Sequence, residues 1–134
     1  MQSLFELKTK LTVDMSVFEQ MKKTAEIELS KAETGQYTQA MVFLSAKGNE
    51  YNTLIKNALS EEKTDEIALL ERMKNSNDTE IHYALCLWQD GGLDIPSYRF
   101  RELLCKLNPK NTELSLLVMT ADGISEIKVS TTMK

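Results

Sequence analysis

The chain has one histidine, His82, and any acid–base mechanism that uses an imidazole depends on it. His82 lies in the apolar run EIHYALCLW, and Trp88 falls on the same face of that run if the chain is extended. We expect His82 to be a hydrogen-bonded core residue. The alternative is that His82, Trp88 and Tyr98 line a pocket for a small ligand or a reaction.

A double glycine follows this run, in the segment QDGGLDIPS. A glycine turn between a strand and a helix is the layout of a phosphate cradle. The spacing matches neither of the two glycine-rich phosphate fingerprints, and Asp90 and Asp94 repel a phosphate. We therefore expect a connecting turn, in which Asp94 caps a helix that Pro96 starts.

Metal ligands are scarce in the sequence. The two cysteines, Cys86 and Cys105, are far apart and lie among apolar residues, so we expect them to be buried free thiols. One histidine and two such cysteines do not make the spacing of a zinc site, and the calcium-loop pattern is absent. The sequence predicts no metal, no cofactor and no catalytic set.

Acidic residues gather in the middle of the chain. Residues 61–94 contain nine acidic and three basic residues, whereas the whole chain has a net charge of −4. Such a surface repels nucleic acid and attracts a basic protein. The candidate partner-binding residues are Glu61, Glu62, Asp65, Glu66, Asp90 and Asp94.

Hydrophobic periodicity predicts the elements that position these residues. Residues 37–59 are ambiguous: we favour a helix, and the alternative is a strand at 38–45 followed by a helix at 49–59. The remaining expected elements are a strand at 4–13, helices at 17–33, 65–74 and 96–107, a central strand at 81–88, and a hairpin around Asp122–Gly123.

These elements give the order β-α-α-α-β-α-β-β. Helices gathered beside a small, mostly antiparallel or mixed sheet make an α+β fold. We expect one globular domain over residues 1–134, with a frayed tail at 130–134.

Composition favours a soluble cytoplasmic protein. The longest apolar run, Tyr83–Trp88, has six residues, far short of the roughly 20 that cross a membrane, and no export signal is visible. We expect no membrane contact and no nucleic acid. The expected partner is another protein of basic charge, and a homodimer is left open.

Few residues of the sequence could carry out catalysis, and this decides between two functions. We expect a small acidic protein-binding module, such as an inhibitor, immunity protein, antitoxin or chaperone, that acts by recognition and not by catalysis. The alternative is a small-ligand binder or enzyme with a pocket around residues 90–97 and His82. A deep pocket with converging polar groups favours that alternative.

Overall fold

The protein has an α+β fold, as its sequence predicts. The computed structural model describes residues 15–33 and 37–133. A mixed six-stranded sheet has the order β2-β1-β3-β5-β6, and the short strand β4 pairs with β3 beside this path. Strands β3 and β5 are parallel, and the other pairs are antiparallel. The expected strand at 4–13 lies outside the described residues.

The described elements follow one another in the order helix, two strands, helix, two strands, helix, two strands. Their bounds are α2 Met15–Ser30, β1 Gln39–Ser45, β2 Glu50–Ile55, α3 Thr64–Asn75, β3 Ile81–Trp88, β4 Leu93–Asp94, α4 Tyr98–Leu107, the 3-10 helix η1 Pro109–Glu113, β5 Ser115–Thr120, β6 Gly123–Lys128 and α5 Val129–Thr132. No helix in the described residues is long and apolar enough to span a bilayer.

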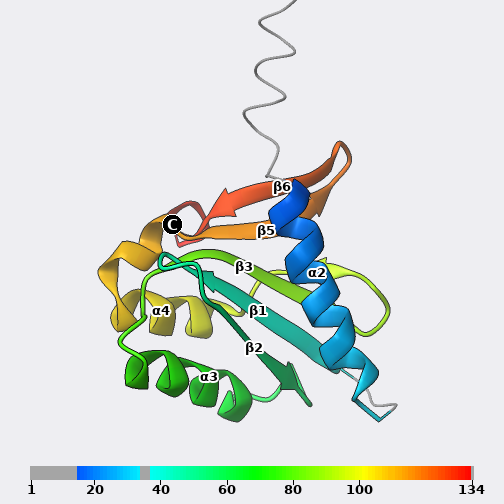
Figure 1. Cartoon of the computed structure of the whole chain (residues 1–134), viewed down its shortest axis with the longest axis horizontal. Helices are drawn as coiled ribbons and strands as arrows, with labels where there is room; N and C mark the ends of the chain where they lie inside the picture. Colours follow the sequence, from blue (N-terminus) through cyan, green and yellow to red (C-terminus); the bar gives the residue numbers. More distant parts are fainter. Residues whose placement is uncertain (1–14, 34–36, 134) are drawn as a thin grey trace, which may run out of the picture.

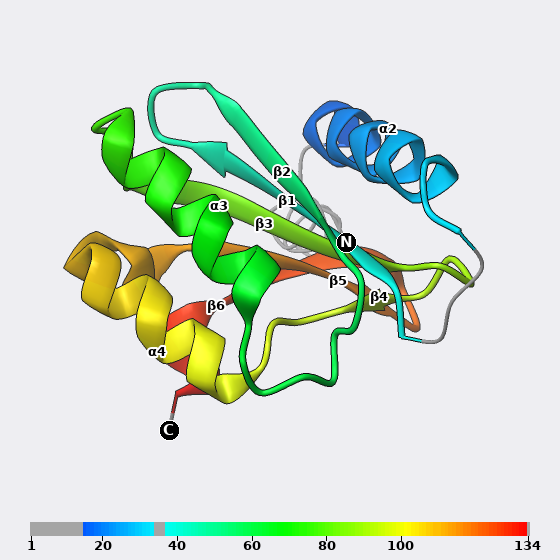
Figure 2. The ribbon, with the colours of Figure 1, turned by 90° about the horizontal axis from the view of Figure 1, so that it is seen from below.

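Helices cover both faces of the sheet (Figures 1 and 2). Helix α2 packs on one face, where it buries Phe18 and Met21 against Leu85. Helices α3 and α4 lie on the other face, where Met41 and Phe43 of β1 meet Phe100 of α4. Strands β1 and β3 are therefore buried on both faces, which confirms the prediction of a covered central strand at 81–88.

Residues 37–59 form a β-hairpin, so the favoured helix is wrong, and so is the alternative helix at 49–59. Strand β1 matches the alternative strand at 38–45, and β2 follows it after a turn in which Gly48 has a φ of 86°. A strand buried on both faces has no alternating pattern, so its apolar residues coincided with helical spacing.

The other predicted elements are present. Helix α2 covers most of 17–33, α3 covers 65–74, and α4 covers most of 96–107. The hairpin β5–β6 turns at Gly123, whose φ of 111° suits glycine. The expected frayed tail is instead a helical turn through Thr132, whose carbonyl accepts a hydrogen bond from Arg101.

The double glycine makes a connecting turn, as expected. Strand β3 ends at Trp88, whose carbonyl accepts a hydrogen bond from the N–H of Gly91. Gly91 has a φ of 95°, and the Asp90 carboxylate accepts from the N–H of Gly92. The chain then returns along β3 as β4. This reversal brings residues 94–97 back over the end of β3.

A buried carboxylate ties the β1–β2 hairpin to the start of β3. Asp78 is 3% exposed, and its Oδ2 accepts hydrogen bonds of 2.9 Å from Ser45, Asn49 and Tyr51. Burial alone raises the pKa of Asp78, but these hydrogen bonds and the charge of Lys47 outweigh it, so the pKa lies below its ordinary value.

We expect Asp78→Asn to lower the free energy of unfolding at neutral pH by about 1.5–3 kcal/mol, because it weakens three hydrogen bonds to a charged acceptor. A lowered pKa gives stability above the unfolded value, near 3.8, which is lost as the pH falls through the folded value. Urea unfolding from neutral to acid pH checks this, with the exposed Asp122→Asn as control. A deficit that persists unchanged at the acid end contradicts this account.

Candidate functional site

A cavity of about 170 Å³ lies where α3 and α4 begin. Its walls come from the start of β1, the end of β3, the segment before α3 and the segment before α4. The lining residues are Gln39, Met41, Ala58, Leu59, Lys63, Glu66, Trp88, Asp94, Ile95, Pro96, Ser97 and Phe100. Polar and apolar groups therefore converge on one hollow.

Lys63 is an unusual residue to find at the base of this cavity. It is 8% exposed, and its ammonium donates a hydrogen bond of 3.1 Å to the carbonyl of Ala58. It occupies the N-cap of α3 with a left-handed backbone, at φ 53°, and no side chain caps the helix there. Lysine is seldom buried, left-handed conformation is uncommon for it, and it cannot accept a capping hydrogen bond.

Glu66 pairs with Lys63 one helical turn later. The distance from Nζ of Lys63 to Oε2 of Glu66 is 3.7 Å, and Glu66 is 5% exposed. Burial raises the pKa of Glu66 above its ordinary value, although its own backbone N–H and the charge of Lys63 act in the opposite direction. A carboxyl group with a raised pKa beside an ammonium is able to accept or donate a proton.

The α4 side of the cavity supplies its rim. Ser97 is the N-cap of α4, and its Oγ accepts a hydrogen bond from the N–H of Phe100, which leaves the hydroxyl proton available. The indole N–H of Trp88 donates to Oδ2 of Asp94 over 3.0 Å. Ser97, and not Asp94, caps α4, so the expected cap is corrected.

The structure separates the residues of the predicted pocket. Trp88 lines the cavity, but His82 lies six residues earlier on β3, about 20 Å away along an extended strand. The His82 side chain is 54% exposed and lies 3.9 Å from Glu80, so it is not a core residue. Tyr98 is 50% exposed and packs under the guanidinium of Arg101.

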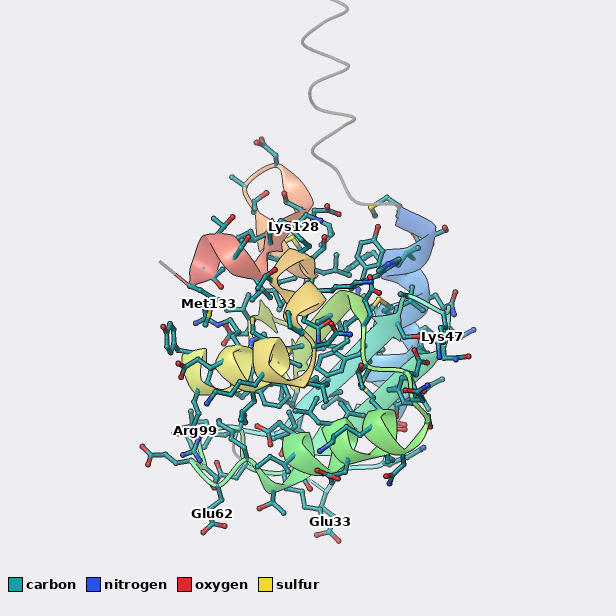
Figure 3. All side chains as sticks on the ribbon, turned by 90° about the vertical axis from the view of Figure 1, so that its left-hand side faces the viewer. Glu33, Lys47, Glu62, Arg99, Lys128 and Met133 are labelled. Carbon is teal, nitrogen blue, oxygen red and sulfur yellow. The ribbon has the colours of Figure 1, made fainter. Side chains whose placement is uncertain are left out.

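The acidic residues of the predicted partner-binding surface also lie apart from one another. Glu61 and Glu62 are exposed, and Glu62 points away from the body of the molecule (Figure 3). The Asp65 carboxylate accepts from the backbone of Lys56, and Asp90 belongs to the β3–β4 turn. Glu66 faces the cavity with Asp94, so the six acids do not form one face.

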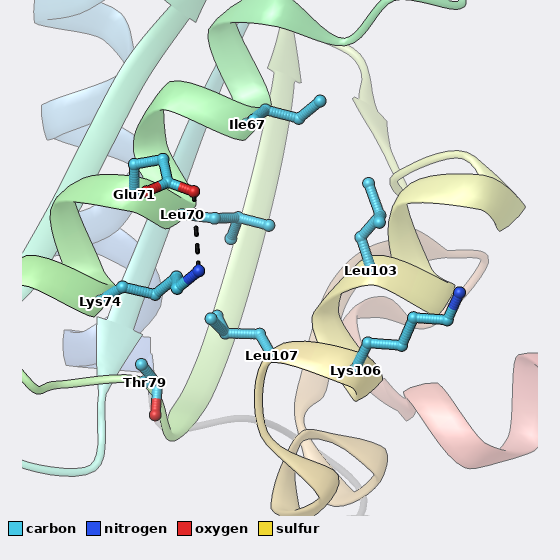
Figure 4. A pocket seen from close by; sticks show the side chains of 8 residues that line it. All are labelled: Ile67, Leu70, Glu71, Lys74, Thr79, Leu103, Lys106 and Leu107. Carbon is cyan, nitrogen blue, oxygen red and sulfur yellow. Dashed lines mark ion pairs between the residues drawn. The ribbon is translucent and has the colours of Figure 1, made fainter.

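A larger hollow runs between α3 and α4 (Figure 4). It has a volume of about 540 Å³, and Ile67, Leu70, Leu103 and Leu107 give it an apolar floor. Its ion pair, Glu71 with Lys74, is more than half exposed. Because its charged groups are at the solvent edge, this groove lacks the convergent buried polar groups of a specific ligand site.

Comparison with known proteins relates the fold to an enzyme. No protein-family model matches the chain, and no curated protein matches it. Among solved structures, a cytidine deaminase from Mycobacterium leprae is similar, with a TM-score of 0.63 and 14% identity over 87% of this chain and 96% of that chain. The chain therefore has a cytidine deaminase-like fold.

This likeness overturns our main functional expectation. A protein-binding module of the inhibitor, immunity, antitoxin or chaperone kind was expected from the small number of possible catalytic residues and from an acidic surface, and that surface is not continuous. The similar solved structure is an enzyme that acts on a small molecule, and the present fold encloses a cavity with converging polar groups. The findings support the alternative, a small-ligand site around residues 90–97, without His82.

Zinc deaminases hold their metal with the signature H-x-E…P-C-x-x-C, in which the glutamate is not a ligand. Two segments of this chain have that spacing: Thr64-Asp65-Glu66 and Pro96-Ser97-Tyr98-Arg99-Phe100. Glu66, Pro96, Ser97 and Phe100 line the cavity. The glutamate and the proline are present. The three ligand positions hold threonine, serine and phenylalanine instead.

The donor set does not fit zinc. Phe100 is 1% exposed and stacks on Phe43 in the core. Cys86 lies in the core, where burial, with the charges of Asp94 and Glu66, raises the pKa of its thiol, and a zinc-bound cysteine must be a thiolate. Within residues 15–33 and 37–133, no three His, Cys, Asp or Glu side chains gather to hold a metal.

Sequence reasoning missed Lys63 as a site residue and placed Glu66 on the surface. One signal was available: Glu66 falls three, four and seven residues before Leu69, Leu70 and Met73, so it belongs to the buried stripe of α3. Ile67, which follows Glu66 in the sequence, is by contrast 38% exposed. A carboxylate on a buried stripe indicates a partner inside the molecule.

We expect Lys63→Met to destabilise the protein by about 3–5 kcal/mol, because it leaves the buried Glu66 carboxylate without its ammonium. Adding Glu66→Leu should restore wild-type stability or exceed it by about 1–4 kcal/mol, because an apolar pair has no charges to desolvate. Urea unfolding at neutral pH measures both.

The exposed pair Glu71 and Lys74 has the same 3.7 Å distance and the same spacing of three residues, so Glu71→Leu with Lys74→Met is the matched control. We expect that control to change stability by less than about 1 kcal/mol. A Lys63 and Glu66 double variant as unstable as Lys63→Met alone would show that the pair is retained for stability.

Proposed function

We propose that the chain binds a small planar heterocycle of the pyrimidine class in the cavity where α3 and α4 begin, without a metal. The observation that carries this proposal is the buried ion pair of Lys63 and Glu66 at the base of that cavity. A pyrimidine is named because the similar solved structure is a cytidine deaminase, which acts on this class.

The Lys63–Glu66 ion pair comes with three features that lower the stability of the fold. Two charges are desolvated, a lysine holds a left-handed backbone, and the start of α3 has no side-chain cap. Conflicts of this kind between local preference and structure gather at functional sites. A ligand that uses the ammonium and the carboxyl group accounts for all three.

The size of the cavity selects a single ring. Its volume of about 170 Å³ is below the 300–1,000 Å³ that drug-sized ligands occupy, so a base fits and a ribose extends past the rim. Met41, Ile95 and Phe100 supply apolar walls for the faces of a ring. This mixture of flat apolar walls and a few fixed polar groups is typical of small-molecule sites.

The polar groups suit the edge of a pyrimidine. The Lys63 ammonium donates to a ring carbonyl oxygen. Glu66 accepts from a ring N–H as a carboxylate, or donates to a ring nitrogen as a carboxylic acid, which its raised pKa favours. The role assigned here is binding, because the residues at the zinc-ligand positions do not supply a metal-activated water.

Isothermal titration with cytosine, uracil, cytidine and uridine tests the proposal. We expect at least one of them to bind with a dissociation constant between about 1 μM and 1 mM, equally with EDTA and with added zinc. Glu66→Gln should weaken binding at least about tenfold, which is about 1.4 kcal/mol, because it removes the charge that pairs with Lys63.

The exposed neighbour Glu62→Gln is the matched control, and its affinity should equal that of the wild type. Two results contradict the proposal: no binding of any of the four compounds, or an equal effect of the two glutamine variants. Binding that requires zinc also contradicts it.

A further inference from the structure

The first residue of β1 is a buried polar residue with an unused side chain. Gln39 is 5% exposed and lines the cavity. Its backbone pairs with Ile55 of β2 on one side and Trp88 of β3 on the other. Within the described part of the chain, no hydrogen bond reaches its side-chain amide.

The amide of Gln39 is available to a ligand and is not a desolvated group. Among the described residues, the one fully buried side-chain N or O atom without a hydrogen-bond partner is Oε2 of Glu50, so the amide of Gln39 keeps contact with solvent. Positions 39, 41 and 43 share one face of β1, and Met41 and Phe43 lie in the core beside α4, so the Gln39 side chain is directed to the cavity on that face. The adjacent Thr38, by contrast, has a hydroxyl that donates to the carbonyl of Lys56.

The chemistry of a primary amide defines what it recognises. Its carbonyl accepts and its NH₂ donates in one plane, so it pairs in a bidentate way with a ligand edge that has a donor beside an acceptor. The N3–H and an adjacent carbonyl of uracil form such an edge, and so do the amino group and N3 of cytosine. Lys63 and Glu66, as single charged groups, do not read this pattern.

We infer that Gln39 determines specificity in this cavity by pairing with an adjacent donor and acceptor on the edge of the bound heterocycle. This inference rests on the proposed function and names the feature of the ligand that is read. It gives a role to the amide at the first position of β1, opposite Trp88 at the end of β3, which also lines the cavity.

The test compares two ligands that differ at one atom. 1-Methyluracil keeps the N3–H, whereas 1,3-dimethyluracil lacks it and carries a methyl group there. We expect the wild type to prefer 1-methyluracil at least about tenfold, because a site built to hydrogen-bond a group rejects the analogue without it. In Gln39→Leu, the affinity for 1-methyluracil should fall and the preference should collapse to less than about twofold.

The matched control is Gln89→Leu, an exposed glutamine that does not line the cavity, and it should keep the full preference. Melting temperatures establish that both variants are folded, and Gln39→Met replaces Gln39→Leu if that variant is not. The wild-type comparison needs no variant.

The outcomes distinguish a failure of the proposed binding function from a failure of the role inferred for Gln39. If the wild type binds neither compound and none of cytosine, uracil, cytidine and uridine, the proposed function fails and the inference falls with it. If the wild type binds 1-methyluracil but does not discriminate, or if the Gln39 variants discriminate as the wild type does, the role of Gln39 is overturned and the binding function stands.

Discussion

The arrangement of this molecule depends on the burial of β1 and β3 on both faces. Because apolar side chains leave each face of these strands, α2 must cover one face and α3 with α4 the other. Strands β2 and β3 end at the same side of the sheet, since Ile55 and Trp88 both pair with Gln39, and both helices begin near that side. The cavity is the space that these two helix starts leave above the ends of the central strands.

Two residues in that space, Lys63 and Glu66, have a burial or a backbone conformation that is unusual for their residue type. Ser97 obeys the usual rule, since it caps α4 and still faces the cavity. Lys63 is buried, has a left-handed backbone and occupies an N-cap position that it cannot cap. Glu66 is a carboxylate on the buried stripe of α3. Asp78 and Asn111 are buried polar residues that are well satisfied: Asp78 accepts three hydrogen bonds, and Asn111 donates two and accepts one. The unusual backbone and burial of Lys63 and Glu66 are the reason for our proposal that the functional site is at the helix starts.

Sequence periodicity identified the elements that have one buried face or a clear turn. Helices α2 and α3 show amphipathic spacing, and the β5–β6 hairpin has its Asp-Gly turn. The β1–β2 hairpin was missed because a strand covered on both faces carries no period of two. His82 was misplaced for a related reason: the neighbouring apolar residues of β3 suggested burial, but near the start of β3 Ile81 is buried while His82, on the opposite face, is exposed.

The site was less predictable than the fold, for a physical reason. Lys63, Gln39 and Ser97 come from three separate segments, and only the packing of those segments brings them together. A lysine or glutamine by itself predicts an exposed position. The zinc-deaminase spacing around Glu66 and Pro96 becomes visible once both segments are seen at one cavity, and the same view shows that the metal ligands are absent from it.

The central claim is that this cavity, and no other hollow of the molecule, receives the ligand. Proton–nitrogen correlation spectra of the labelled protein during titration with 1-methyluracil test it most directly. We expect the largest shifts at the Gln39 side-chain amide and at the backbone amides of residues 63–67 and 97–100. Shifts centred instead on the groove at Leu70, Leu103 and Leu107, or near His82, contradict the account.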